Sequence, residues 1–221
     1  MKVLVVGANG KIGHQVVTML EESNTHSVRA FVRKEEQAEE LKQKGIEAHL
    51  GNLEGSVSDL GEAVKGVDAV VFSAGSGGST GADKTLLIDL DGAVKVIEAA
   101  QNVGVDRFIL VSAFGANNRE SWIGNEDMAP YYVAKHYADK ALEQSNLDYT
   151  IVRPGGLLDE PAKDKIKVAE NLEVSESDEG TVPREDVAKV IVASLDNEKT
   201  YRKAFDLVSG EQAIEEALNQ L

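Results

Sequence analysis

The sequence places a tyrosine and a lysine four residues apart in the segment APYYVAKHYADKAL, residues 129–142. Residues at this spacing lie on the same face of an α-helix. A phenol hydroxyl beside an ammonium group can exchange a proton with a bound substrate, so Tyr131 and Lys135 are a candidate proton-transfer pair. The same spacing also occurs in helices that perform no chemistry, and here Tyr132 and His136 repeat it on a rotated face. The elements around the pair therefore decide its interpretation.

Short apolar, β-branched runs alternate with longer stretches of helical period along most of the chain. In the stretches of helical period, apolar residues recur every three or four positions. This alternation is typical of β-α-β units, in which helices cover both faces of a parallel sheet. We predict an α/β protein with a doubly wound parallel sheet in three αβα layers, and Tyr131 and Lys135 on the helix between the fifth and sixth strands. The predicted strands are 2–7, 27–33, 46–51, 68–75, 107–113 and 148–154, and a late strand is expected in KAFDLVS, residues 203–209.

The chain changes in composition after Gly156. Residues 159–180 are rich in charge and poor in large apolar side chains, so they cannot form a core of their own and are expected to lie over one edge of the sheet. We expect one domain over residues 1–221, with 157–221 as a small C-terminal extension on the substrate side. Ligands bind outside the carboxyl ends of the strands in such sheets, so the charged segment could serve as a lid or a substrate wall.

A glycine-rich turn follows the first predicted strand and is the strongest signal in the chain. The segment VVGANGKIG holds three glycines at intervals of three, where the first helix begins. Glycine allows a tight turn and a close approach of the backbone to a ligand, and a helix N-terminus attracts phosphate. These features predict a dinucleotide site of the Rossmann type. The residues expected to contact the dinucleotide are Gly7, Ala8, Asn9, Gly10, Lys11, Ile12 and Gly13.

The end of the second strand indicates which dinucleotide binds. A carboxylate there would bind the adenosine ribose hydroxyls, whereas an arginine would pair with a 2′-phosphate. The sequence has Arg33 followed by Lys34, and the guanidinium fork suits a phosphate, so NADP is favoured over NAD. Glu35 and Glu36 follow at once and are assigned to the first turn of the next helix. The alternative is that Arg33 is a solvated loop charge.

The ends of the third and fourth strands should also point towards the cofactor. An asparagine there could bind the adenine edge, and small residues would let the dinucleotide lie flat against the sheet. Ordinary turn chemistry would account for the same residues. The residues expected to line this part of the crevice are Gly51, Asn52, Leu53, Ser73, Ala74 and Gly75.

Charge and composition exclude several classes of function. The chain has 38 acidic and 23 basic residues, a formal charge of −15, which disfavours nucleic acid and anionic membranes as partners. It has no cysteine, which rules out thiolate catalysis, and its four histidines show no metal-ligand spacing, so no metal site is expected. No signal-peptide pattern or membrane-length apolar run is seen, and a cytoplasmic protein is expected.

Taken in order, the segments VVGANGKIG, AFVRK, GNL, FSAG, LVSAFGA, YYVAK and DYTIVRPGGL resemble the short-chain dehydrogenase/reductase superfamily. The similarity is greatest to its atypical branch of NAD(P)-binding oxidoreductases and NAD-dependent epimerase-like proteins. It covers nearly the whole chain and is weakest from about 158 to 182.

The resemblance implies an active site formed by Ser112, Tyr131 and Lys135. Lysine would hold the nicotinamide ribose and lower the tyrosine pKa, tyrosine would exchange a proton with a substrate oxygen, and serine would bind that oxygen. Pro154 and Gly155 would lie near the nicotinamide amide.

The resemblance leaves two functions open. One is an NADP-dependent oxidoreductase, or an epimerase-like variant, acting on a small carbonyl or alcohol compound. The other is a non-catalytic, redox-sensing regulator similar to the NmrA-like members. Where extended members have an active-site asparagine, this chain has Asp89, which cannot donate as an amide does. The substrate walls would come from residues 114–128, with Trp122 and Met128 as the notable large side chains, and from the charged segment after 158. Members of the superfamily occur as monomers and homodimers.

Overall fold

A computed structural model of the chain describes residues 1–124, 126–173 and 180–221. Part of the charged segment 159–180 lies outside these ranges, and so does Asn125 in the expected substrate wall. Within the described residues, one sheet has the strand order β11-β8-β10-β6-β5-β4-β1-β2-β3. Its seven strands from β10 to β3 run parallel, and β8 is antiparallel to β10 and to β11. The doubly wound fold predicted from the sequence is therefore confirmed.

All the predicted strands are present. They are β1 (Lys2–Val6), β2 (Ser27–Val32), β3 (Glu47–Leu50), β4 (Ala69–Phe72), β5 (Arg107–Val111), β6 (Asp148–Pro154) and β10 (Lys203–Ser209). The strands that were not predicted are β7 (Gly156–Leu158), β8 (Lys165–Ala169), β9 (Thr181–Pro183) and β11 (Gln212–Ala213), of which β7 and β9 pair as a separate ribbon.

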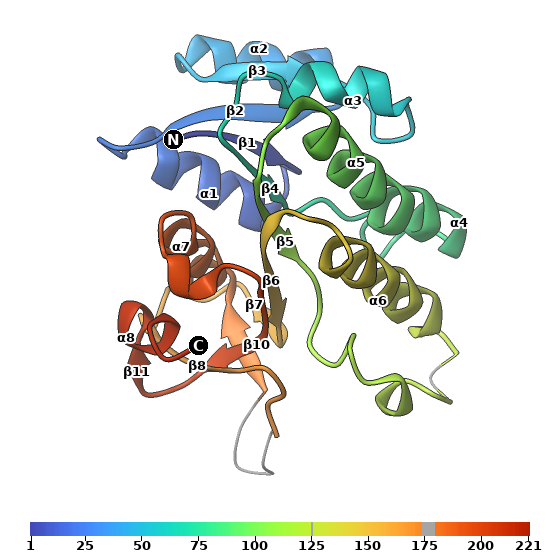
Figure 1. The fold of residues 1–221 in the computed structure, drawn as a ribbon, viewed down its shortest axis with the longest axis vertical. Helices are drawn as coiled ribbons and strands as arrows, with labels where there is room; N and C mark the ends of the chain where they lie inside the picture. Colours follow the sequence, from blue (N-terminus) through green and yellow to red (C-terminus); the bar gives the residue numbers. More distant parts are fainter. Residues whose placement is uncertain (125, 174–179) are drawn as a thin grey trace.

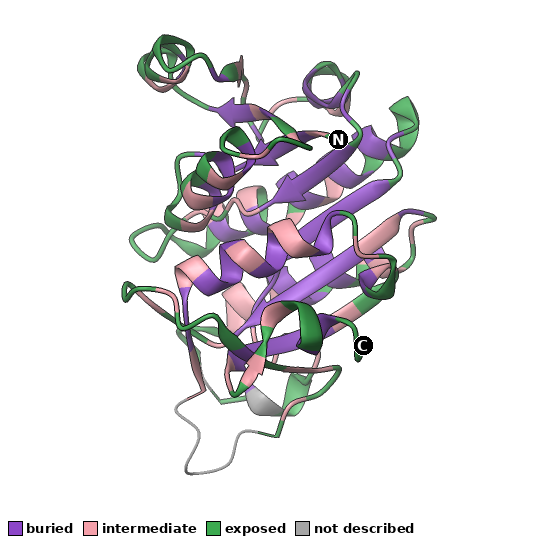
Figure 2. Cartoon of the chain, turned by 90° about the vertical axis from the view of Figure 1, so that its left-hand side faces the viewer, coloured by how far each residue is buried: buried purple, intermediate pink, exposed green. Residues whose placement is uncertain are grey.

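Helices cover both faces of the sheet (Figure 1). On one face α1 (Lys11–Glu21), α2 (Glu35–Gln43), α7 (Arg184–Ser194) and α8 (Ile214–Leu218) contribute to one hydrophobic core. On the other face α3 (Val57–Val64), α5 (Ala93–Val103) and α6 (Ala129–Glu143) contribute to a second core. The central strands between the two layers are almost wholly buried (Figure 2). This arrangement leaves the carboxyl ends of the strands as the edge where loops can build a site.

The charged segment is more regular than expected. Residues 165–169 form β8, which pairs with β10 and extends the main sheet instead of lying over its edge. The reason is the alternation in KIKVA, which buries Ile166 completely while Lys165 and Lys167 stay exposed. One apolar face is sufficient for a strand near the edge of a sheet.

The stretch of helical period over residues 85–103 contains a π-helical turn. A short α4 (Ala82–Lys84) continues into the π-helical η1 (Thr85–Gly92) and then into α5. The turn places Asp89 on the inner side, where only 3% of its surface is exposed. Among the described helices of the chain, none combines the length and apolar character needed to cross a membrane.

Candidate functional site

The glycine-rich turn forms a cradle in which side chains have no room. Gly7 adopts a φ of +91°, and a Cβ on it would lie 2.6 Å from the backbone nitrogen of Ala74. A Cβ on Gly13 would lie 2.2 Å from the carbonyl oxygen of Gly7, and the Gly10 N–H donates to that same oxygen at 2.9 Å. The first turn of α1 therefore sits directly against the end of β1, as a backbone-lined pyrophosphate site requires.

A cleft of about 600 Å³ opens in front of this cradle. Its volume lies in the range typical of cofactor sites. Residues that the sequence predicted and that line it are Gly7, Asn9, Gly10, Arg33, Asn52, Leu53, Ser73, Ala74 and Gly75. The predicted residues Ala8, Lys11, Ile12, Gly13, Lys34, Gly51, Lys135, Pro154 and Gly155 are not part of this lining. Gly51 instead lines a smaller adjoining pocket of about 240 Å³.

Several lining residues were missed in the sequence analysis. They are Phe31, Val32, Gln37, Glu54, Ser76 and Ile88. Most sit one to four positions from a predicted residue, so widening each strand-end motif would have found them. Gln37 and Ile88 differ from the others because they lie in helices and not at the ends of strands.

Arg33 follows β2 with its side chain exposed at the cleft. Within residues 1–124, 126–173 and 180–221 its guanidinium makes no ion pair. Gln37, from the first turn of α2, lines the same part of the cleft. An unpaired arginine beside an amide can bind a phosphate oxygen.

Lys11 does not line the cleft because its ammonium is drawn towards the C-terminal extension. It lies 2.5 Å from Asp159, and Arg184 at the start of α7 binds the other oxygen of that carboxylate at 2.7 Å. The hydrogen bond from Lys11 is the main reason that the pKa of Asp159 is lowered. These three side chains connect the glycine cradle to the segment after β7.

Lys135 is buried at the end of β5, with an exposed fraction of 5%. Its Nζ donates to the carbonyl oxygen of Val111 at 3.2 Å and lies 3.4 Å from Oδ1 of Asp89. Asp89 in turn accepts a hydrogen bond from the Ser76 N–H, in the wall of the cleft, at 2.8 Å. The ammonium is therefore fixed beside the cleft by a carboxylate and a strand carbonyl.

Tyr131 is half-buried one helical turn before Lys135, whose Nζ is 5.7 Å from the centre of its ring. Burial raises the pKa of Tyr131 above its ordinary value of 10.0, although the charge of Lys135 acts in the opposite direction. The phenol is therefore neutral at physiological pH and can donate a proton.

The expected substrate wall packs on the same helix through aromatic rings. Trp122 stacks on Tyr132 with ring centres 6.0 Å apart, and Tyr132 meets Tyr131 edge-on at 5.6 Å. His136 binds the carbonyl oxygen of Ala116 at 2.8 Å. A tyrosine with a purely structural role would pack in the same way, so this cluster does not by itself indicate proton transfer by Tyr131.

Ser112 follows β5 but its hydroxyl is enclosed by protein. Its Oγ makes no hydrogen bond of ordinary length to any described residue. Burial raises the pKa of the nearby Asp139 carboxyl. The ion pair with Arg153 and the neighbouring Ser112 hydroxyl both act to lower that pKa. Contact between Ser112 and a substrate oxygen would therefore require its side chain to rotate.

Pro154 and Gly155 are held by neighbouring backbone. The Gly155 N–H donates to Leu207 at 2.9 Å, the Pro154 carbonyl accepts from Phe114 at 2.9 Å, and a Cβ on Gly155 would lie 2.1 Å from the Gly180 oxygen. Here glycine is needed so that the C-terminal extension can approach β6.

A larger cavity than this cleft lies away from the glycine cradle. A groove of about 860 Å³ runs beside α6 along β6, β8 and β10. Its central charges are already paired, because Arg153 binds Glu143 and Asp139, and Lys140 binds Glu143. The smaller cleft combines the glycine cradle and the unpaired arginine, so it is the better candidate for the cofactor site.

Known proteins resemble the chain over its full length. Residues 7–198 match the family model described as NAD(P)H-binding. A Bacillus subtilis protein named as an uncharacterized sugar epimerase, YhfK, is 55% identical and aligns over 100% of both chains. A solved Bacillus halodurans structure assigned as an NAD-dependent epimerase/dehydratase is 42% identical, with a TM-score of 0.91 and 100% coverage of both chains.

A more distant solved structure, an anaerobillin reductase of Escherichia coli O157:H7, is 25% identical with a TM-score of 0.78, and the alignment covers 96% of this chain and 98% of that one. Both solved structures share the fold of this chain, and the relatives agree with the match to the NAD(P)H-binding family model. The chain therefore belongs to the NAD(P)H-binding family, and its sheet has the Rossmann fold.

Proposed function

We propose that this protein is an NADP(H)-dependent oxidoreductase that reduces a carbonyl group of a small molecule. The observation that carries the proposal is the buried ammonium of Lys135, held beside the cleft with the neutral phenol of Tyr131 next to it. An ammonium is costly to bury, so its position one helical turn from a proton donor favours chemistry over packing.

The chain's own groups divide the work. The backbone around Gly7 and Gly10 would hold the pyrophosphate, and Arg33 would pair with the 2′-phosphate. When bound, the reduced nicotinamide supplies the hydride. Lys135 would bind the ribose hydroxyls with its remaining N–H, and Tyr131 would give its phenolic proton to the substrate oxygen as the carbonyl becomes an alcohol.

Removal of the phenol hydroxyl tests this mechanism. Tyr131→Phe is expected to reduce kcat by about 100-fold or more, because general acid catalysis contributes on that order, while the Kd for NADPH changes little. The parent enzyme should keep its reductase rate from neutral pH to about pH 10, because the raised pKa keeps Tyr131 protonated. The rate at which the protein reduces a panel of carbonyl compounds is followed by the loss of NADPH absorbance. Tyr132→Phe is the matched control. A Tyr131→Phe variant with full activity would exclude Tyr131 as the donor.

A redox-sensing regulator is the alternative that one observation favours, namely the enclosed hydroxyl of Ser112. A regulator would bind NADPH without reducing any compound, and capture of a partner protein would depend on NADPH. Pull-down experiments with and without the nucleotide, using a cleft variant such as Arg33→Ala as the control, separate the two functions.

A further inference from the structure

The carboxylate of Asp159 lies between the first residues of α1 and α7, two helices that pack side by side (Figure 1). One of its oxygens is 2.5 Å from Nζ of Lys11, and the other is 2.7 Å from a guanidinium nitrogen of Arg184. Lys11 directly follows Gly10, which lines the candidate cofactor cleft. A carboxylate of the C-terminal extension therefore holds the ammonium group that follows the glycine cradle.

The stretch of residues 159–164 is fastened to α7 at its other end. The backbone N–H groups of Lys163 and Asp164 donate to the two carboxylate oxygens of Asp186 at 2.9 and 3.0 Å, and Asp186 is completely buried. Two charge-assisted hydrogen bonds to a buried carboxylate make this end the firmer of the two. Asp159 is thus the outer end of a short stretch that joins the glycine cradle to α7 and, through β8, to the sheet.

The ion pair between Lys11 and Asp159 can be exchanged at low cost. The two side chains are 63% and 59% exposed, and exposed ion pairs add little to stability because water screens them. A pyrophosphate group at the cradle would carry two negative charges, and hydrogen bonds between an ammonium group and a phosphate oxygen are among the stronger ones. A lysine side chain is flexible enough to turn from one anion to another. The pyrophosphate should therefore displace the carboxylate from the ammonium group.

Asp159 keeps a partner when Lys11 leaves it. Arg184 is only 22% exposed, and its guanidinium also donates to the carbonyl oxygen of Leu157 at 3.2 Å. Arg184 therefore stays with the C-terminal extension, while the contact between Asp159 and α1 is lost. Before the cofactor binds, Asp159 also places a negative charge close to where an anion must bind, which lowers the affinity of the cleft for that anion.

We propose that Asp159 competes with the cofactor pyrophosphate for Lys11, so that cofactor binding releases residues 159–164 from the glycine cradle. The C-terminal extension, which lies on the expected substrate side, then responds to whether the cleft holds a dinucleotide. This exchange requires binding of the dinucleotide but no turnover, so it goes beyond the proposed reductase function and applies equally to a regulator.

Nucleotide affinities, measured by fluorescence titration, test the competition. Asp159→Asn removes the competing charge, and the Kd values for NADPH and NADH are both expected to fall by about two- to fivefold, the scale of one exposed ion pair. Both should fall because the two nucleotides share the pyrophosphate. The matched control is Asp148→Asn, an exposed acid that pairs with Arg202 at 3.5 Å at the amino end of β6, for which no change is expected. An unchanged or higher Kd for NADPH in Asp159→Asn overturns the proposal.

A double-mutant cycle shows whether the effect depends on Lys11. Lys11→Gln is expected to raise the Kd for NADPH by about tenfold, because a charge-assisted hydrogen bond to the pyrophosphate is lost. Adding Asp159→Asn to Lys11→Gln should then change the Kd by less than about 1.5-fold. If the added substitution still lowered the Kd by about two- to fivefold, Asp159 would act on the cleft without Lys11, and the proposal would be wrong.

A dye next to Asp159 measures the release of the stretch. The chain has no cysteine, so Glu160→Cys, at an exposed position, provides a single site for labelling. The fluorescence anisotropy of the dye is expected to fall when NADP⁺ saturates this protein, and to stay unchanged when Lys11→Gln is added, because the contact with α1 is then already absent. An unchanged or higher anisotropy without Lys11→Gln overturns the release.

Neither experiment needs a substrate, so the two proposals can fail separately. The same exchange is expected in the Tyr131→Phe protein, whose lack of activity concerns the reductase function alone. Full turnover by Tyr131→Phe would exclude the proposed proton donor and leave the competition for Lys11 to be decided by the Kd values.

Discussion

At the scale of single residues, the candidate site depends on a few positively charged side chains that have at most one carboxylate partner each. Lys135 has one carboxylate partner, and Arg33 has none among the described residues. An anionic cofactor bound by a protein of net charge −15 needs such local cations, because the overall field repels it. Arg33 is the residue on which the choice between NADP and NAD should depend.

Replacement of Arg33 by alanine is expected to weaken NADPH binding by about 10- to 100-fold, the equivalent of about 1.4–2.8 kcal/mol for lost charge-assisted hydrogen bonds. NADH binding should change by less than about threefold, because NADH lacks the 2′-phosphate. The Kd values are measured by fluorescence titration, with thermal shifts as support.

Lys34→Ala is the matched control for that experiment, since Lys34 is the adjacent cation and does not line the cleft. A parent protein that NADH stabilises more than NADPH would contradict the assignment of Arg33.

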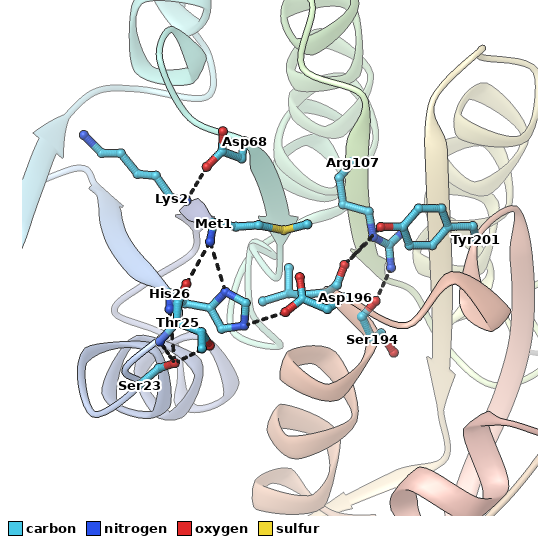
Figure 3. Close-up of polar contacts among 11 residues, drawn as sticks. Met1, Lys2, Ser23, Thr25, His26, Asp68, Arg107, Ser194, Asp196 and Tyr201 are labelled. Carbon is cyan, nitrogen blue, oxygen red and sulfur yellow. Dashed lines mark hydrogen bonds and ion pairs between the residues drawn. The ribbon is translucent and has the colours of Figure 1, made fainter.

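Among the elements, β5 is supported at both ends. Its carboxyl end leads to Ser112 and receives Lys135, while its first residue, Arg107, is buried beneath the end of α7 (Figure 3). The guanidinium donates to the carbonyl oxygens of Ser194, Leu195 and Asp148 at 2.5, 3.2 and 2.7 Å. It also lies 4.3 Å from the centre of the Tyr201 ring, and burial lowers its pKa to about 10. One side chain thus joins α7 to the central strand.

Arg107→Ala should therefore lower the free energy of unfolding by about 3–5 kcal/mol, because several buried carbonyls lose their donor at once. The control is Arg202→Ala, an exposed arginine that pairs with the side chain of Asp148 at 3.5 Å, for which less than about 1 kcal/mol is expected. Urea denaturation of both variants measures the difference. Equal losses would show that the Arg107 network contributes little.

The regular strands and helices could be predicted from the sequence, and so could the positions where the backbone requires glycine. Short apolar, β-branched runs and helical stretches of period three to four predicted β1 to β6 in their observed places, and the glycine spacing predicted the cradle. Partners that depend on tertiary contact were not readable. The salt bridge from Lys11 to Asp159 joins residues far apart in the chain, and the π turn that brings Asp89 to Lys135 has no period that distinguishes it from α-helix.

At the scale of the whole molecule, a buried carboxylate lies where the C-terminal extension meets the sheet. Asp206 on β10 is 3% exposed; its Oδ2 accepts the Leu172 N–H at 3.0 Å, and its Oδ1 is bonded to no described residue. Burial raises the pKa of Asp206 above 3.8, and the charge of Asp139 adds to that rise, whereas Arg153 opposes it. The folded state therefore holds this proton more tightly than the unfolded state.

It follows that ionised Asp206 lowers stability as pH rises from about 4 towards the folded-state pKa. Asp206→Asn should match the parent near pH 4 and become more stable than the parent by about 1 kcal/mol at pH 7–8. Urea denaturation at several pH values tests this, with Asp196→Asn as an exposed control. A variant less stable than the parent at pH 8 would mean that Arg153 requires the charge of Asp206.

The π turn in η1 has an evolutionary consequence. A π turn differs from α-helix by one extra residue, so a single-codon deletion there would restore α-helical bonding and rotate one side of the helix relative to the other by about 100°. That rotation would carry Asp89 away from Lys135 and leave the glycine cradle untouched. Within a lineage of such proteins, proton chemistry could thus be gained or lost in one genetic event while cofactor binding is inherited unchanged.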